Sequence, residues 1–230
     1  PYQHISQQFV TLVESIDSKM FPRVKRVVAP LNVRLPKVQL TGAETEAFAL
    51  RFYAHAPSSV GKKMVLIYPS GGLLSIRAWP LKSYCRLAEK LLQAGYAVGI
   101  IGMKEDKPLA ETILTHCDHA DCIDLTGFTR SLRELMVLFH MAALLITNDG
   151  GPGQFSALTP IPTIVFFGPE TPVLYGPLDH KTVVFHSPLS CSPCLSAYNH
   201  RNSPCDGDNV CLTSISVDQV IEKALSMLES

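Results

Sequence analysis

The sequence carries no net charge, because its 20 lysines and arginines are balanced by 20 aspartates and glutamates. A basic patch or stripe is the usual electrostatic footprint for nucleic acid or an anionic membrane, so neither partner is expected. No apolar run approaches the roughly 20 residues that a transmembrane helix needs, and no signal peptide is expected. The glycine pattern GxGxxG and the Walker lysine are also missing, which disfavours the common dinucleotide and triphosphate motifs.

What the sequence has is ample apolar material, since 47% of its 230 residues are hydrophobic and only 17% are charged. That composition excludes disorder and predicts a soluble, intracellular protein with one large domain, or one domain and an appendage. A chain that starts at Pro1 suggests a fragment or a processed product.

The most informative stretch runs from Leu144 to Pro177. Its apolar start predicts a buried strand over 144–147 and is followed by Asn148-Asp-Gly-Gly-Pro-Gly153, a short helix over 154–158 and a second buried strand over 163–167. A strand that leads through glycines into a helix directs backbone N–H groups and the positive helix dipole at one point, as phosphate sites do. The alternative is a tight connection in which Asp149 only caps the helix.

Elsewhere the chain divides near residue 61. Residues 1–61 read as connector helices and a linker: an amphipathic helix over 2–20, a proline-punctuated linker over 21–40, and a helix from a capping box at Thr41 to about Ala56. From residue 62, strands and helices alternate. Strands are expected over 64–68, 96–101, 122–125 and 182–186. Helices are expected over 80–93, 107–117, 131–143 and 217–228. This order predicts an α/β fold, a Rossmann-like parallel sheet with helices on both faces.

Ligands of such open sheets bind at the carboxyl ends of the strands. Three loops should meet there: residues 70–79, which begin with the turn residues Ser70 and Gly71, residues 102–106, and residues 149–154. Arg77 is a candidate to neutralise a phosphate, and Glu105 is a candidate to accept hydrogen bonds from ribose hydroxyls. The alternative for each is an ordinary surface charge.

Four cysteines fall within a short polar segment over 191–211: Cys191, Cys194, Cys205 and Cys211. Their number fits a structural four-cysteine zinc site, although the second pair is spaced more widely than usual. Two disulfides and four free thiols are the alternatives, and an intracellular location disfavours disulfides.

Several segments together resemble glycosyltransferase family 9, the heptosyltransferases of lipopolysaccharide core assembly and their relatives. These segments are YPSGGLLSIRAWPLKSY and GYAVGIIG, then LTGFTRSLREL, then NDGGPGQFSAL and PTIVFFGPETP, and finally CSPC. The similarity covers residues 62–230 in order, and residues 1–61 resemble the connector between that family's two domains.

The resemblance implies one half of a GT-B glycosyltransferase, the C-terminal domain that binds the nucleotide-sugar donor. It implies an inverting, metal-independent transfer of a heptose-like sugar from an ADP- or GDP-linked donor to a lipopolysaccharide core or related glycolipid acceptor. The family's catalytic aspartate lies in the other domain, and no residue here matches it, so no catalytic base is assigned. The rival interpretations are a non-catalytic nucleotide-sugar-binding or interaction domain and a nicotinamide-dependent oxidoreductase.

Residue by residue, the resemblance places Arg77 where the family usually has a lysine thought to contact the diphosphate. Asp149, Gly150 and Gly151 match its Asp-[Ser/Thr]-Gly turn, with a glycine in place of the hydroxyl residue, and Gln154 stands where a histidine is frequent. Glu105 falls in the loop of the ribose-binding acid, where Asp106 competes for the role. The resemblance also implies that catalysis requires no cofactor and that the location is cytoplasmic, with the surface of the inner membrane as a further possibility.

Overall fold

The computed structural model describes residues 3–17, 35–195, 202–203, 205 and 207–229. These residues form a six-stranded sheet whose neighbouring strands are all parallel, in the order β3-β2-β1-β4-β5-β6. The strands are β1 (Met64–Tyr68), β2 (Ala97–Gly102), β3 (Cys122–Thr126), β4 (Leu144–Asn148), β5 (Thr163–Phe167) and β6 (Thr182–His186). The predicted Rossmann-like α/β fold is therefore confirmed, and the predicted edge strand over 182–186 is β6.

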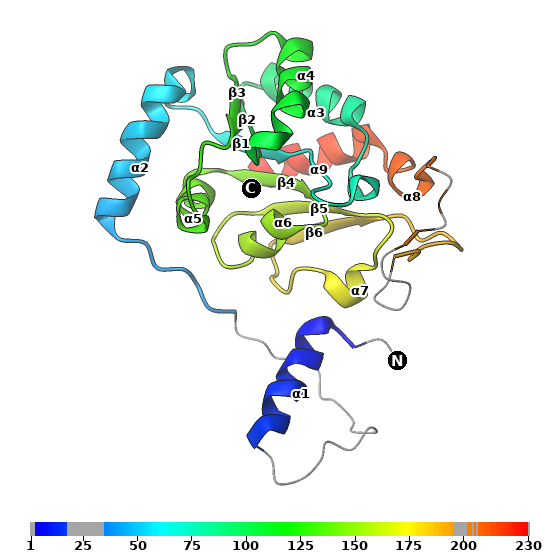
Figure 1. The fold of residues 1–230 in the computed structure, drawn as a ribbon. Coiled ribbons are helices and arrows are strands. Elements are labelled where there is room, and N and C mark those ends of the chain that lie inside the picture. Colours follow the sequence, from blue (N-terminus) through cyan, green and yellow to red (C-terminus); the bar gives the residue numbers. More distant parts are fainter. Residues whose placement is uncertain (1–2, 18–34, 196–201, 204, 206, 230) are drawn as a thin grey trace.

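Helices cover both faces of the sheet (Figure 1). One layer consists of α3 (Leu81–Gln93), α4 (Lys107–Cys117) and α9 (Val217–Glu229), and the other of α2 (Gly42–His55), α5 (Leu132–Met141) and the short α6 (Gly151–Ser156). Two further short helices are α7 (Pro172–Tyr175) and α8 (Val210–Thr213), and α1 (Ile5–Asp17) precedes the domain.

Strand side chains alternate between the two layers, as the pleat requires. Val65 and Ile67 pack with the α3 layer, while Met64 and Leu66 pack with the α2 layer. All four are buried, and each such side chain contributes about 1.5–3 kcal/mol of apolar transfer energy. This two-sided burial explains why the strands read as continuous apolar runs rather than as alternating ones.

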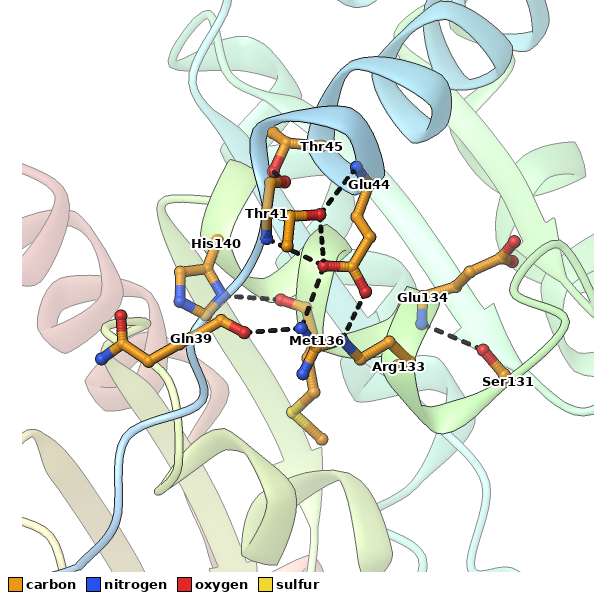
Figure 2. A network of polar contacts seen from close by, with 9 residues as sticks. All are labelled: Gln39, Thr41, Glu44, Thr45, Ser131, Arg133, Glu134, Met136 and His140. Atoms are coloured by element: carbon orange, nitrogen blue, oxygen red, sulfur yellow. Dashed lines mark hydrogen bonds and ion pairs between the residues drawn. The ribbon is translucent and has the colours of Figure 1, made fainter.

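Helix α2 begins at the predicted capping box. The Thr41 hydroxyl accepts from the Glu44 amide at 3.3 Å, and the Glu44 carboxylate accepts from the Thr41 amide at 2.8 Å (Figure 2). Phe48 and Phe52 of this helix are buried in the same core as the sheet. The division of the chain at residue 61 stays a prediction, but α2 packs on the domain that follows it.

Two local predictions need correction. The helix expected over 154–158 is α6, which begins earlier, at Gly151, because Pro152 fixes a helical φ in its first turn. The pattern Ser131-x-x-Glu134 also predicts a capping box at the start of α5, but only half of it forms. The Ser131 hydroxyl accepts from the Glu134 amide, whereas the Glu134 carboxylate accepts from the Arg130 amide and pairs with Arg51. The linker expected over 21–40 lies mostly outside the described residues.

Candidate functional site

The strand order reverses between β1 and β4, so this is the switch point at which open α/β sheets bind their ligands. The loops after β1 and β4 are joined there by the side chain of Asn148, which is completely buried. Its Oδ1 accepts from the Trp79 amide at 2.9 Å and from the Tyr84 hydroxyl at 2.8 Å. Its Nδ2 donates to the carbonyls of Pro69 at 3.1 Å and Ser70 at 3.0 Å. We call these joined strand ends and their loops the switch-point edge.

The turn after β1 is held in a tight conformation. The Ser70 hydroxyl accepts from the Gly72 amide at 3.0 Å, and Gly72 has a φ of 62°. A Cβ at Gly71 would lie 2.5 Å from the Leu74 carbonyl oxygen, so only glycine fits there. Ser70 thus shapes the edge through its hydroxyl and its carbonyl, and Gly71 through its backbone.

Arg77 lies in a 3-10 turn, Ser75–Arg77, within this loop. Its Nη2 donates to the Glu170 carboxylate, and its Nε lies 3.8 Å from Oδ2 of Asp149. The structure therefore brings two predicted site residues together, Arg77 and Asp149, and adds Glu170. Both carboxylates are buried, which makes this an internal charge cluster rather than a surface ion pair.

The turn after β4 has one tight position and one open one. Gly150 adopts extended backbone with a φ of 173°, and a Cβ there would meet nothing nearer than 3.9 Å. A Cβ at Gly153 would lie 3.3 Å from Val165. Gly151 is exposed, and Gln154 is exposed and donates to the Tyr175 carbonyl at 2.6 Å. Gln154 therefore connects α6 to α7. The sequence analysis predicted a ligand contact for this side chain and did not predict this hydrogen bond.

The loop after β2 meets the edge through Tyr68. Burial raises the pKa of the Tyr68 phenol, and the negative charge of the nearby Asp106 raises it further. A hydrogen bond with Ser70 opposes this shift. Asp106 accepts from the Met103 amide at 2.8 Å. Glu105 is exposed and forms no hydrogen bond or ion pair with other described residues, so the structure does not bring it into the charge cluster.

Sequence reasoning overlooked Glu170 and saw Asn148 only as part of a turn. Glu170 lies in the loop Gly168-Pro169-Glu170 that follows β5, at the same edge of the sheet as the other loops. A charged residue straight after a buried strand was the available signal. Trp79 is buried against Phe166 with ring centroids 4.6 Å apart, so it packs beneath the loop and is not exposed to a ligand.

The four cysteines of the 191–211 segment line one cavity of about 290 Å³ together with Asp208 and Asn209. None of the four takes part in a disulfide in the structure. Burial raises the pKa of the Cys211 thiol, and the neighbouring Cys194, Cys205 and Cys191 add to that shift. Within the described residues, no three His, Cys, Asp or Glu side chains are arranged to hold a metal ion.

A larger cavity of about 640 Å³ lies elsewhere, between the end of α2 and strand β3, and includes His55, Lys107 and Asp124 in its lining. We place the functional site at the switch-point edge because that edge combines buried charges, a glycine-shaped turn and the sheet's topological switch point. No helix among the described residues is long and apolar enough to cross a membrane.

The sheet order defines a Rossmann-like α/β domain whose topological switch point lies between β1 and β4. The chain belongs to glycosyltransferase family 9 (heptosyltransferase), whose sequence model matches residues 9–203. It is 29% identical to lipooligosaccharide heptosyltransferase 2 of Haemophilus influenzae over 143 residues, which are 60% of this chain and 41% of that protein.

Two solved structures share the fold. The ADP-heptose lipopolysaccharide heptosyltransferase II of E. coli has a TM-score of 0.71 and 22% identity, over 87% of this chain and 56% of that one. The family 9 glycosyltransferase of Veillonella parvula has a TM-score of 0.75 and 20% identity, over 100% and 62%. The present chain thus spans about two fifths of the curated relative and somewhat more than half of these structures.

Proposed function

We propose that this chain supplies the donor-binding half of a glycosyltransferase that moves a heptose-like sugar from a nucleotide-diphosphate donor to a lipopolysaccharide core or related glycan. The observation that carries the proposal is Arg77, a cation with a 14% exposed side chain at the switch point of a family 9 domain. The named relatives support heptose as the sugar and ADP as the nucleotide. A GDP-linked donor is the second candidate.

The chemistry follows from where charge develops. In an inverting transfer the acceptor hydroxyl attacks the anomeric carbon, that C–O bond forms, and the bond to the diphosphate breaks, so negative charge builds on the leaving diphosphate. A prepositioned guanidinium stabilises such charge strongly when water is excluded. Asp149 repels phosphate oxygens and therefore serves best by orienting the turn or by accepting from a sugar hydroxyl. The base that deprotonates the acceptor is assigned to no residue of this chain.

Isothermal titration calorimetry with ADP-heptose and a GDP-sugar tests donor binding. We expect the ADP donor to bind with a Kd between about a micromolar and a millimolar, the usual range for enzyme substrates. Arg77→Gln should weaken binding at least about tenfold, the factor that about 1.4 kcal/mol represents. The matched control is Arg86→Gln, because Arg86 forms only an exposed pair with Asp218. Absence of binding by both donors would remove the proposal.

A non-catalytic nucleotide-sugar-binding domain is the alternative. Gly150 and Gln154 both differ from the residues usual at these positions in family 9, and the chain spans only part of the length of its relatives. Incubation with ADP-heptose and a lipopolysaccharide acceptor separates the two functions. With the family's acceptor-binding domain also supplied, product formation supports the transferase, whereas donor binding without product supports the binding domain.

We also propose that Cys191, Cys194, Cys205 and Cys211 hold a structural metal ion such as zinc. Support comes from their number and from the cavity that all four line, and the proposal requires their side chains to converge further than they do among the described residues. Thiolates suit zinc and iron alike, so the test is elemental analysis of the purified chain. One equivalent of metal, lost in the Cys211→Ser variant, is the expected result. A metal-free chain of unchanged melting temperature would contradict it.

The proposed location is the cytoplasm, peripheral at the inner membrane, where a glycolipid acceptor would be met. The balanced charge of the chain supplies no electrostatic attraction to anionic lipid. Any membrane association should therefore depend on the acceptor. Flotation with vesicles that contain or lack lipopolysaccharide measures this dependence.

A further inference from the structure

Arg77 stands between two carboxylates in a place from which water is largely excluded. The side chains of Arg77 and Glu170 are 14% and 4% exposed, and that of Asp149 is 9% exposed. Among the residues that the structure describes, the ion pairs of this cluster join one cation, Arg77, to two carboxylates. Charges in such a setting interact far more strongly than surface charges do, so the partner that Arg77 prefers is decided within this cluster.

Residues of the 191–211 segment form hydrogen bonds with the backbone beside both Arg77 and Glu170. The Pro169 carbonyl, next to Glu170, accepts from the amides of Cys194 and Leu195, both at 2.9 Å. The Ile76 carbonyl, next to Arg77, accepts from the Asn209 side chain at 2.8 Å. Neither member of the pair is free to move far, and the ion pair is a built part of the edge.

A guanidinium and an ammonium behave differently in this position. The described contacts of Arg77 use Nη2 for Glu170 and direct Nε toward Asp149, and none of them uses Nη1. Arginine presents five N–H donors on a rigid plane, so it can bind a carboxylate along one edge and a phosphate along another. A lysine ammonium is a point charge on a flexible stem, and a buried carboxylate beside it would capture it.

We propose that Glu170 is a positioning residue of the donor site, which holds Arg77 so that Nη1 remains available to the phosphates of a nucleoside diphosphate. The proposal rests on the proposed function, because it assigns the phosphate partner of that same site. It has a specific consequence: while Glu170 is present, residue 77 has to be arginine. Without the charge of Glu170, a lysine serves at position 77 as well.

A double-mutant cycle with ADP as the titrant tests this coupling. Calorimetry is run on the native chain, Arg77→Lys, Glu170→Gln and the double variant. We expect R77K to weaken ADP binding about tenfold or more, since the ammonium pairs with Glu170. E170Q should stay within about threefold of the native chain, because an amide still accepts from Arg77, and R77K/E170Q should recover to about the same level.

Glu170→Asp is the charge-retaining control, and R77K/E170D should stay as weak as R77K. Thermal melting confirms that each variant folds, and Glu170→Ser provides a second neutral background should the amide variant fail to fold. An equal loss from R77K with and without the Glu170 charge overturns the coupling while leaving donor binding intact. A native chain that binds no ADP overturns the proposed function itself, so the two failures are distinguishable.

Discussion

Two arginine–carboxylate networks of this domain have similar chemistry and opposite surroundings. At the switch-point edge, Arg77 and Glu170 are 14% and 4% exposed. Between α2 and α5, Arg133 and Glu44 are 47% and 34% exposed, with Nε and Oε1 2.7 Å apart (Figure 2). The first pair joins the loops after β1 and β5, and Asp149 adds the loop after β4, whereas the second pair joins two helices across their surface.

The difference teaches that burial, rather than the number of polar contacts, decides what such a network does. Exposed ion pairs contribute about 0–1 kcal/mol, since water and salt screen them. Breaking a buried pair or a buried hydrogen bond leaves a group without solvent and costs several times more. We therefore expect substitutions at the switch-point edge to lower the unfolding free energy more than substitutions in the network between α2 and α5 do. The expected effects follow, from the largest to the smallest.

The largest effect is expected from Asn148→Ala. The change leaves two buried donors and two buried carbonyls of the edge without their partner, and we expect a loss of about 3 kcal/mol or more in unfolding free energy. Urea denaturation measures it. Tyr84→Phe is the control, because it removes only one of those bonds and should cost about 1 kcal/mol. Equal losses of unfolding free energy from the two variants would refute the central role of the Asn148 side chain.

A smaller loss is expected from Gly71→Ala. The added Cβ would lie 2.5 Å from the Leu74 carbonyl oxygen, and the strain should cost about 2 kcal/mol. The matched control is Gly150→Ser, whose Cβ would meet no atom nearer than 3.9 Å and should change stability by less than about 0.5 kcal/mol. Comparable losses at the two glycines would show that the β1 turn is not uniquely tight.

At the α2–α5 network, Thr41→Ala should cost about 1 kcal/mol, the usual value of a helix N-cap. Thr45→Ala provides the comparison within the same helix, because the Thr45 hydroxyl donates only to the Thr41 carbonyl at 3.1 Å. That variant should be neutral or slightly stabilising, since alanine has the higher helix propensity. Chemical denaturation that ranks the two variants in reverse would contradict the capping box.

The smallest effect concerns pH. The hydrogen bond from Arg133, followed by those from the Thr41 amide and hydroxyl, lowers the pKa of Glu44 from 4.5 to about 2. A depressed folded-state pKa adds stability above pH 4.5, which is lost as the pH falls toward 2. Over this range the native chain should lose more stability than Glu44→Gln. Identical pH profiles would exclude the effect, and about 1 M salt should shrink it.

The sequence predicted the local features of the fold better than the long-range contacts of the site. The capping box at Thr41 was predictable because its partners are three residues apart, and the strands were predictable because both of their faces are buried. Glu170 was not, since it lies 93 residues from Arg77 and meets it only through the strand order. Asn148 likewise joins residues 64 to 79 positions away. Glu105, assigned by its loop alone, lies outside the charge cluster.

The most direct test of donor binding at the switch-point edge is amide hydrogen exchange with and without ADP-heptose. We predict slower exchange in residues 69–77, 148–154 and 168–170, whose backbones form the edge, and little change around the cavity beside β3. Protection confined to residues 55–58 and 120–128, which line that cavity, would contradict the placement of the site.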